Sequence, residues 1–456
     1  MRITLVFLVG VLIGGIVVWA ATGGWTSFTG AFPRPTSGPP TTMAPGGHVR
    51  EFRLEAKPGK WELFPGMVTD AWTYNGQVPG PELRVREGDL VRVVLTNHLQ
   101  VPTTIHWHGV ELNYKMDGVP GVTQETVQPG QTFTYEFIAT PAGTRMYHSH
   151  QDTNAQLELG LFGALIIEPR NGPTYDLERT IILRERALDF TPEVAQGTQT
   201  VRSADSGNGR GGALQYDLFL MDGKAGAAIP PIRVKPNQRV LLRLINLGNL
   251  VHSMHLHGHT FTIVATDGNP VPPGGRLRKD TVLIGPGERY DVEVVTNNPG
   301  VWMFHCHMPN HGENGMMTMM QYDGFTPLHE HGGLPGLPGA GLVPTPSALQ
   351  GAHGQAVTPP SLPAQAAKPS RGRTVTIPIL DNRYSPGTIS IAVGTKVRWV
   401  NRGQNIHTTT SLDGLWDSPG LERKRDFAFT FTTPGEYRYL CRQHLLQGMV
   451  GVIRVK

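Results

Sequence analysis

The sequence predicts an all-β protein made of three related β-sandwiches. Its 456 residues are enough for about three domains. Glycine (56) and proline (38) are abundant and long helical patterns are scarce, which favours short strands joined by tight turns. The third observation is an internal repeat: a Pro/Gly turn, an aromatic strand and a cluster of His or Cys recur at residues 140–150, 298–307 and 433–441.

The first 47 residues are predicted to be a targeting segment followed by a tether. An apolar run of 19 residues extends from Ile3 to Ala21, and Arg2 is the only basic residue before it. We interpret residues 1–21 as a signal peptide or a single membrane anchor without a twin-arginine motif. Either interpretation places the remainder outside the cytoplasm, as a periplasmic, secreted or outward-facing anchored protein. Residues 22–47 are rich in Gly, Pro, Ser and Thr, which is typical of a flexible tether.

The remaining chain divides into three strand-rich domains and one linker. We expect domains at residues 48–170, 171–325 and 374–456, and a Gly/Pro/Ala-rich linker at residues 326–373. The strand-like runs are Asp89–Leu95, Thr132–Ile138 and Gly163–Ile167 in the first domain, Thr180–Leu183, Arg239–Ile245, Thr260–Val264 and Tyr290–Val295 in the second, and Thr374–Ile379, Thr388–Val400 and Phe427–Thr432 in the third.

Charge and cysteine content limit the function classes. The net charge is only +4 and there is no polybasic run, so nothing favours nucleic-acid binding. From residue 374 on, 11 Lys/Arg stand against 6 Asp/Glu, a surplus of +5 that could steer an anionic partner, although a solvated surface is the simpler explanation. The two cysteines could form a disulfide, but each lies in its own metal-like spacing, so we expect both to bind metal.

The stretch from Phe304 to His307 is the centre of the second domain. Side chains alternate along a strand, so Cys306 points to one face and its two neighbouring histidines to the other. One strand can therefore contact two metal sites. Cys306, His311 and Met316 have the spacing of a blue-copper site, which needs a thiolate, two imidazoles and a long axial thioether. His252 is the natural second imidazole.

The three repeats differ at the position of this cysteine, where Ser149, Cys306 and Cys441 align. The first domain has the flanking histidines but no thiolate, the third has the thiolate but no histidine pair, and only the second has both. The third domain contains a second complete blue-copper set: His407, Cys441, His444 and Met449. Zinc is the alternative there, but the methionine and the lack of a second thiol argue against it.

Four His-x-His pairs provide a further set of imidazoles. On strands each pair points one way, so eight imidazoles from two domains can converge on a cluster of transition metal. The pairs are His106 and His108, His148 and His150, His255 and His257, and His305 and His307. His259, close to the third pair, is interpreted as an outer or surface residue.

These motifs resemble those of the multicopper oxidases, in particular the laccase-like enzymes with two cupredoxin domains. His106-Trp-His-Gly, His148-Ser-His, His252-x2-His-Leu-His-Gly and His305-Cys-His-x3-His-x4-Met are the four copper motifs of that family, in order, within residues 48–325. The last domain resembles plastocyanin-type cupredoxins and adds to the usual two-domain pattern. The resemblance therefore implies three cupredoxin-like Greek-key β-sandwiches.

The resemblance also implies ligand assignments and a reaction. A lone copper would take His106 and His255, a coupled copper pair would take the other six paired histidines, and blue copper would take His252, Cys306, His311 and Met316. With the second blue site, the total is about five coppers per chain. The reaction would be four one-electron oxidations of a donor coupled to reduction of O2 to two waters.

Oxygen reduction also consumes four protons, so the resemblance implies acids near the cluster. Asp117 lies where the family's relay aspartate follows His-Trp-His-Gly, although an Asp-Gly turn would also explain it. The family's second acid would follow the blue-copper histidine, where this chain has Gly312 with Glu313 beside it, so the second proton route is open.

Two-domain relatives build the copper cluster between neighbouring chains, which implies a homotrimer. A copper nitrite reductase is an alternative, but it would place a thiolate in the first domain, at Ser149. An electron carrier or copper-binding protein is another, but it would leave eight histidines without a purpose. The donor stays open among phenols, ferrous or cuprous ions and a redox protein.

Overall fold

The structure is a computed structural model that describes residues 17–19, 25–27, 38–197, 214, 216–327, 374–412 and 415–456. It divides into two compact units, residues 1–40 and residues 41–456. In the first unit, β1 (Val17–Trp19) pairs antiparallel with β2 (Trp25–Ser27). Most of the predicted signal or anchor segment, half of the tether and nearly all of the linker lie outside the described residues. Among the helices that are described, none is long and apolar enough to span a membrane.

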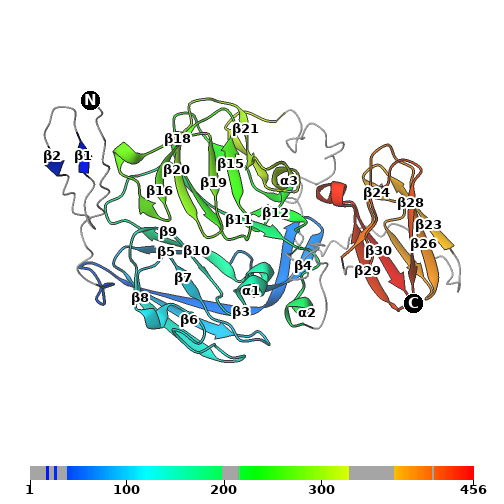
Figure 1. Ribbon diagram of the computed structural model, residues 1–456, viewed down its shortest axis with the longest axis horizontal. Helices are drawn as coiled ribbons and strands as arrows, with labels where there is room; N and C mark the ends of the chain where they lie inside the picture. Colours follow the sequence, from blue (N-terminus) through cyan, green and yellow to red (C-terminus); the bar gives the residue numbers. More distant parts are fainter. Residues whose placement is uncertain are drawn as a thin grey trace, which may run out of the picture. The chain divides into compact units, whose positions relative to one another are not determined.

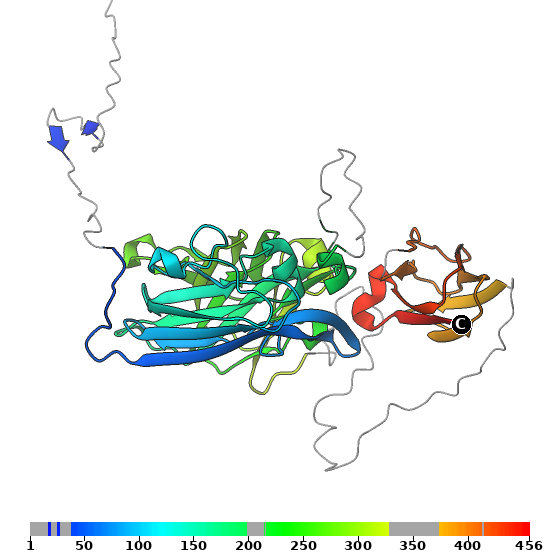
Figure 2. The same cartoon turned by 90° about the horizontal axis from the view of Figure 1, so that it is seen from below.

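The first domain is a sandwich of two four-stranded sheets (Figures 1 and 2). One sheet has the order β4 (Met67–Tyr74), β3 (Val49–Phe64), β6 (Leu90–Asn97), β8 (Thr132–Ile138). The other has the order β5 (Leu83–Arg86), β10 (Phe162–Glu168), β9 (Gly143–His148), β7 (His106–His108). Alternate residues of both sheets meet in one core, including Val93 of β6, Tyr135 of β8 and Trp107 of β7.

The second domain repeats this plan with larger sheets. The first sheet has the order β12 (Leu218–Met221), β11 (Leu177–Arg186), β14 (Arg239–Asn246), β20 (Arg289–Val295), β16 (Phe261–Thr266), β17 (Asn269–Pro270), and β18 (Arg278–Lys279) pairs with β16. The second sheet has the order β13 (Ile232–Val234), β22 (Met317–Tyr322), β21 (Val301–Cys306), β15 (His252–Leu256), β19 (Thr281–Ile284). Cys306 and Met316 lie in the core between them, almost without exposure.

The third domain is the smallest sandwich. Its sheets have the orders β24 (Arg383–Tyr384), β23 (Thr374–Leu380), β26 (Thr395–Asn401), β28 (Asp426–Phe431) and β25 (Thr388–Ile391), β30 (Val450–Val455), β29 (Gly435–Leu440), β27 (Thr410–Ser411). The predicted single run Thr388–Val400 is wrong: it forms two strands in different sheets. Gly394, with φ of +84°, turns the chain between them.

A further apolar core joins the domains. In β10, Leu165 and Ile167 face the first-domain core, while Phe162, Ala164 and Ile166 face this second cluster. Both faces of β10 are thus buried, which explains its continuous apolar sequence. The cluster also contains residues from β3, β11, β12 and β14 and, from the third domain, Leu440 and Leu445.

Among the described residues, helices are few and short. They are α1 (Thr153–Leu159), α2 (Pro192–Ala195) and α3 (Pro309–Glu313), with 3-10 turns at Tyr114–Met116, Gly226–Ala228, Pro273–Gly275 and Arg442–Gln447. Two of these elements follow the cysteine strands: α3 comes after β21, and the last 3-10 turn comes after β29. Each of the two contains a histidine, His311 or His444, that lies close to the preceding cysteine.

Candidate metal centres

The second domain brings its predicted blue-copper ligands together. The ligand atoms of His252, Cys306 and His311 all lie within 4.8 Å of one another, and the three side chains are buried. Cys306 Sγ is 3.6 Å from His311 Nδ1, and the Nδ1 atoms of the two histidines are 3.2 Å apart. The Cys306 amide donates to the Met316 carbonyl (3.0 Å), which brings the fully buried Met316 beside the cluster.

The third domain reproduces this arrangement. Cys441 Sγ lies 3.3 Å from His444 Nδ1 and 3.8 Å from His407 Nδ1. The Cys441 amide donates to the Met449 carbonyl (3.0 Å). In both clusters a backbone amide also donates to the sulfur, from Ser253 and from Thr408, each at 3.3 Å. The two clusters therefore share ligand types, ligand order and backbone support.

The donor atoms of both clusters fit copper. Two imidazole nitrogens that face each other at 3.2 Å inside a protein need a shared cation or proton between them. Burial lowers the pKa of His311 and of His444 to about 4, so both rings are neutral ligands at neutral pH. Burial raises the pKa of the Cys306 thiol, so a metal must displace its proton on binding. Two imidazoles, one thiolate and one thioether are the blue-copper ligand set.

The corresponding position in the first domain holds a hydrogen-bonded triad instead. The Ser149 and Thr103 hydroxyls both donate to Gln156 Oε1, the Thr103 bond being 2.7 Å long. All three side chains are at most 1% exposed. The Ser149 amide donates to the Leu161 carbonyl (3.1 Å), as the cysteine amides do to the methionine carbonyls. Serine, threonine, glutamine and leucine thus occupy the places of the copper ligands.

The first domain also gathers four of the paired histidines. Strands β7 and β9 pair antiparallel with His106 opposite His148, and the rings of this pair are 5.3 Å apart. The ring of His106 is 5.6 Å from that of His108 and 5.4 Å from that of His150. Burial is the main cause that lowers the pKa of His108 to about 4 and that of His148 to about 3, so these imidazoles are neutral.

The second domain gathers the other four. His255 pairs across β15 and β21 with His305, and the Nε2 atoms of His257 and His305 are 3.0 Å apart. The ring of His307 lies 5.3 Å from that of His255. Cys306 faces the sandwich core between His305 and His307, as the strand alternation predicted.

Hydrogen bonds fix the tautomer of one member of each pair. The Nδ1 atoms of His106, His148, His255 and His305 donate to the carbonyls of Asp117, Ser149, Asp280 and Cys306 at 2.8–3.0 Å. A carbonyl only accepts, so Nδ1 carries the proton and Nε2 is left as the metal ligand. The blue-copper histidines are oriented the opposite way, with Nδ1 toward the sulfur.

The eight histidines form two groups within one chain. Among the described residues, ring contacts between the paired histidines occur only within the first-domain set or only within the second-domain set. Each group offers four imidazoles.

The two predicted acids differ in position. The Asp117 carboxylate lies 3.3 Å from His106 Nδ1, in addition to the carbonyl contact. Glu313 is exposed at the end of α3. A Cβ at Gly312 would lie 3.6 Å from His305 Nδ1. Position 312, next to Glu313, therefore faces the histidines, but its glycine has no side chain that could act there. A role for Glu313 stays a prediction.

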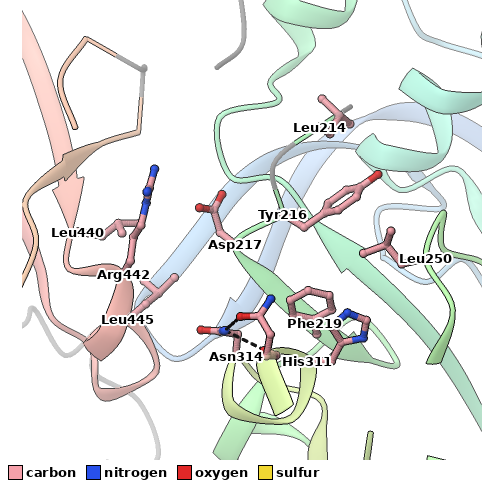
Figure 3. A pocket seen from close by; sticks show the side chains of 11 residues that line it. Leu214, Tyr216, Asp217, Phe219, Leu250, His311, Asn314, Leu440, Arg442 and Leu445 are labelled. Atoms are coloured by element: carbon pink, nitrogen blue, oxygen red, sulfur yellow. Dashed lines mark hydrogen bonds between the residues drawn. The ribbon is translucent and has the colours of Figure 1, made fainter. Parts of the chain in front are cut away.

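A cavity of about 420 Å³ opens beside the cluster of His252, Cys306 and His311 (Figure 3). His311 lines it, and Phe219 stacks on the His311 ring with centroids 4.0 Å apart and planes inclined by 16°. Tyr216 and Leu250 complete this side. Leu440, Arg442 and Leu445 line the other, from the segment that carries Cys441 and His444.

The structure adds site residues that motif spacing could not identify. Phe219 on β12 stacks on His311, and the backbone carbonyl of Asp280, between β18 and β19, accepts from His255. Glu185 lies on β11, and its carboxylate is 3.3 Å from His252 Nε2. Burial opposes ionisation of Glu185, but the His252 hydrogen bond and the charge of Arg184 outweigh it and lower the pKa. A sequence signal was absent because these contacts depend on strand register.

Comparisons with known proteins match the three domains separately. Sequence profiles of the multicopper oxidase family match residues 55–172 and 194–324, and a profile of plastocyanin/azurin-type copper-binding proteins matches residues 374–456. Multicopper oxidase MmcO of Mycobacterium tuberculosis is 33% identical over 270 residues, which cover 55% of this chain and 52% of that protein. Laccase-2 of Botryotinia fuckeliana is 36% identical over 258 residues, which cover 51% of this chain and 41% of that protein. The chain thus spans about half the length of these curated relatives.

Solved structures extend the likeness. The blue copper oxidase of Nitrosomonas europaea is 37% identical, with a TM-score of 0.53, and the match covers 60% of this chain and 86% of that one. A copper nitrite reductase of the same organism, at 23% identity, shares only the fold. The sequence profiles, these structural matches and the cupredoxin-like sandwiches agree, and we conclude that the chain belongs to the multicopper oxidase family, with an added plastocyanin/azurin-type copper-binding domain.

Proposed function

We propose that the protein is a copper-dependent oxidase that removes single electrons from a donor and reduces O2 to water. The observation that carries this proposal is β21, where Cys306 belongs to the thiolate cluster and His305 to the imidazole group. Bound copper would supply the one-electron chemistry at both places. The chain would supply a short covalent link between them, neutral imidazoles and a dry setting for the thiolate.

The proposed cluster is completed by a second chain. Each chain offers one group of four imidazoles from its first domain and one from its second. Joining the first-domain group of one chain to the second-domain group of the next makes an eight-imidazole site, and a head-to-tail contact of this kind closes into a ring. The homotrimer implied by the family resemblance satisfies this condition, with about five coppers per chain.

The donor is proposed to bind at the cavity beside His311. Its volume suits a small aromatic donor, and Tyr216, Phe219 and Leu250 offer apolar contacts. Leu440 and Leu445 line the same cavity, so the third domain can cover it or bring a second thiolate cluster close to it. The proposed location is extracytoplasmic, by a cleaved signal or a retained anchor at residues 1–21.

Asp117 is the proposed proton donor for oxygen reduction. Its carboxylate lies beside His106 while its own carbonyl accepts from the ring, so the acid is held close to the ligand but not on the metal-binding nitrogen. Glu313 is exposed and faces solvent, so it would act as an entry group rather than as a direct donor.

Two alternative functions, nitrite reduction and electron transport, agree less well with the arrangement of the side chains. A nitrite reductase of the two-domain type would need a thiolate where Ser149 is held by Gln156. An electron carrier would use only the two thiolate clusters and leave both imidazole groups without a role.

Copper per chain, measured after reconstitution with excess copper and desalting, distinguishes the three functions. Five coppers per chain, in a trimer that consumes O2 with a phenol, would support the oxidase. Three coppers would match two blue sites and one mononuclear site, and would favour nitrite reduction. Two would favour an electron carrier or a trimer that failed to assemble, and sedimentation of the same sample separates those cases.

A further inference from the structure

Three loops, one in each domain, have the same backbone design. An asparagine at the end of a core strand holds each loop. Its side-chain amide donates to the carbonyl four residues on, inside the loop, and to a carbonyl of a neighbouring segment. Its side-chain oxygen accepts from the backbone amide two residues on. The asparagines are Asn97, Asn246 and Asn401. Six residues later in the sequence stand Thr103, His252 and His407. The loops of the second and third domains therefore position the upstream histidine of each blue-copper cluster.

Strand register places a carboxylate next to two of these loops. Asn246 is opposite Leu183 in a parallel pair and Asn401 is opposite Ile379, and the acids Glu185 and Asp381 come two residues after those partners. In the first domain Asn97 is opposite Ala56, and the residue two positions on is Pro58. The acid is thus present where the histidine is present and absent where threonine replaces it.

Each acid contacts both the loop and the histidine. Glu185 Oε1 accepts from the amides of Asn249 and Leu250, and Glu185 Oε2 lies 3.3 Å from His252 Nε2. Both side chains are fully buried. The same carboxylate therefore fixes the loop backbone and the ring.

In the third domain the contact between the acid and the histidine is longer and more exposed. Asp381 Oδ1 accepts from the amides of Gln404 (2.7 Å) and Asn405 (3.0 Å). It lies 3.6 Å from His407 Nε2, which is too long for a direct hydrogen bond but close enough for a charge interaction. Asp381 is 44% exposed, so solvent screens its charge more than that of Glu185.

A glycine in each loop makes room for the acid. A Cβ at Gly248 would overlap Glu185 Oε2, and a Cβ at Gly403 would overlap Asp381 Oδ1. Neither glycine has a left-handed φ, so the need is for space rather than for backbone freedom. The first domain has Leu99 at this position. Acid, glycine and histidine are therefore present together twice and missing together once.

We propose that Glu185 and Asp381 are positioning residues for the two blue-copper sites. Each carboxylate faces Nε2 of the upstream histidine, so the ring keeps its proton there and presents Nδ1 to the metal. The negative charge also favours the oxidised over the reduced metal, which lowers the reduction potential. The proposal rests on copper binding at the thiolate clusters and does not depend on which donor is oxidised.

The test uses full-length protein with one blue site at a time. Cys441→Ser keeps the second-domain site and Cys306→Ser keeps the third-domain site. In each background the blue absorption is titrated anaerobically to give the reduction potential, and copper affinity and the melting temperature of the apoprotein are measured. The acid variants are Glu185→Gln and Asp381→Asn, and Asp323→Asn, an exposed acid of the second domain, is the control for net charge.

We expect Glu185→Gln to raise the potential of the second-domain site and to leave the third-domain site unchanged. Asp381→Asn should raise the potential of the third-domain site by a smaller shift, because Asp381 is partly exposed. Gly248→Ala and Gly403→Ala should displace the carboxylate without removing its charge, and weaken copper binding by about 10–100-fold. The apoprotein should melt close to wild type in the Gly403 and Asp381 variants, because Asp381 is partly exposed and can move into solvent.

Potentials that follow Asp323→Asn rather than the site acids would overturn the proposal. So would glycine variants that bind copper as tightly as wild type. If Glu185→Gln fails to fold, the exposed Asp381 and its glycine still decide the outcome. A wild-type protein without any blue absorption would instead refute copper binding at the thiolates, which is a separate failure.

Discussion

Substitution of Glu158 tests whether a buried ion-pair cluster joins the first two domains. It lies on α1, is fully buried, and accepts hydrogen bonds from Arg184 (3.1 Å), Arg186 (3.0 Å) and the Ala187 amide (2.7 Å). Both arginines are at most 2% exposed and belong to β11 or its end, the strand that carries Glu185. Glu158→Gln removes the charge that compensates two buried guanidinium groups.

The expected loss is large because the remaining charges stay buried. Removing one partner of a buried ion pair typically costs about 3–5 kcal/mol. Here the guanidinium groups keep carbonyl acceptors at Leu247 and Phe190, so the fold should survive at reduced stability. An exposed pair, by contrast, contributes about 0–1 kcal/mol. Asp70→Asn, which breaks the exposed pair with Lys60, is the matched control.

Urea unfolding of the apoprotein, followed by circular dichroism, measures the free energy of unfolding for wild type and both variants. Hydrogen exchange at the Ala187 amide gives a local measure, since that amide donates directly to Glu158. A loss of about 3 kcal/mol or more for Glu158→Gln, with about 1 kcal/mol or less for Asp70→Asn, would agree with the structure. Equal losses in the two variants would refute a dry, charge-compensated junction.

Three further predictions concern the proton donor, the third domain and the pH dependence of stability. Asp117→Asn should slow O2 uptake at saturating donor by about 10²-fold or more while copper content is unchanged, and an unchanged rate would remove Asp117 from proton delivery. Cys441→Ser should bind one copper fewer and slow turnover with a protein donor more than with a small phenol, whereas equal slowing would argue against a relay. Burial opposes ionisation of Asp89, but hydrogen bonds from the His48 and Arg86 amides and from Arg50 outweigh it and lower the pKa. Its stabilisation is therefore complete above the unfolded pKa of about 3.9 and is lost as the pH falls through the lower folded value. Asp89→Asn should cost about 1–3 kcal/mol at pH 7, and this difference, measured by urea unfolding, should shrink below about pH 4.

Much of the site was predictable because copper ligands occupy short motifs on single strands. Alternation along β21 is enough to separate Cys306 from His305, and the structure places both as that alternation requires. Strand ends were less predictable: Thr388–Val400 is rich in strand-forming residues on both sides of Gly394, and the turn at that glycine divides the run into two strands. Propensity alone does not show where a chain leaves one sheet for another.

The supporting residues could not be predicted for a different reason. Glu185 and His252 are 67 positions apart and meet only because β11 pairs parallel with β14 in one register. A shift of that register by one residue would point Glu185 to the opposite face. Contacts of this kind depend on the relative placement of whole strands, which local patterns do not specify.

The triad of Thr103, Ser149 and Gln156 has a consequence for how easily the first domain could acquire a thiolate site. A site without a metal must satisfy its buried polar groups in another way, and here one amide oxygen satisfies both hydroxyls. Ser149→Cys alone would leave the Gln156 amide oxygen with one donor fewer. Thr103→His alone would force a larger ring into a filled space. Each single substitution is therefore destabilising before a complete set of copper ligands is present. Because the three side chains depend on one another, the first domain resists gaining a thiolate site by single substitutions, and thiolate chemistry belongs to the other two domains.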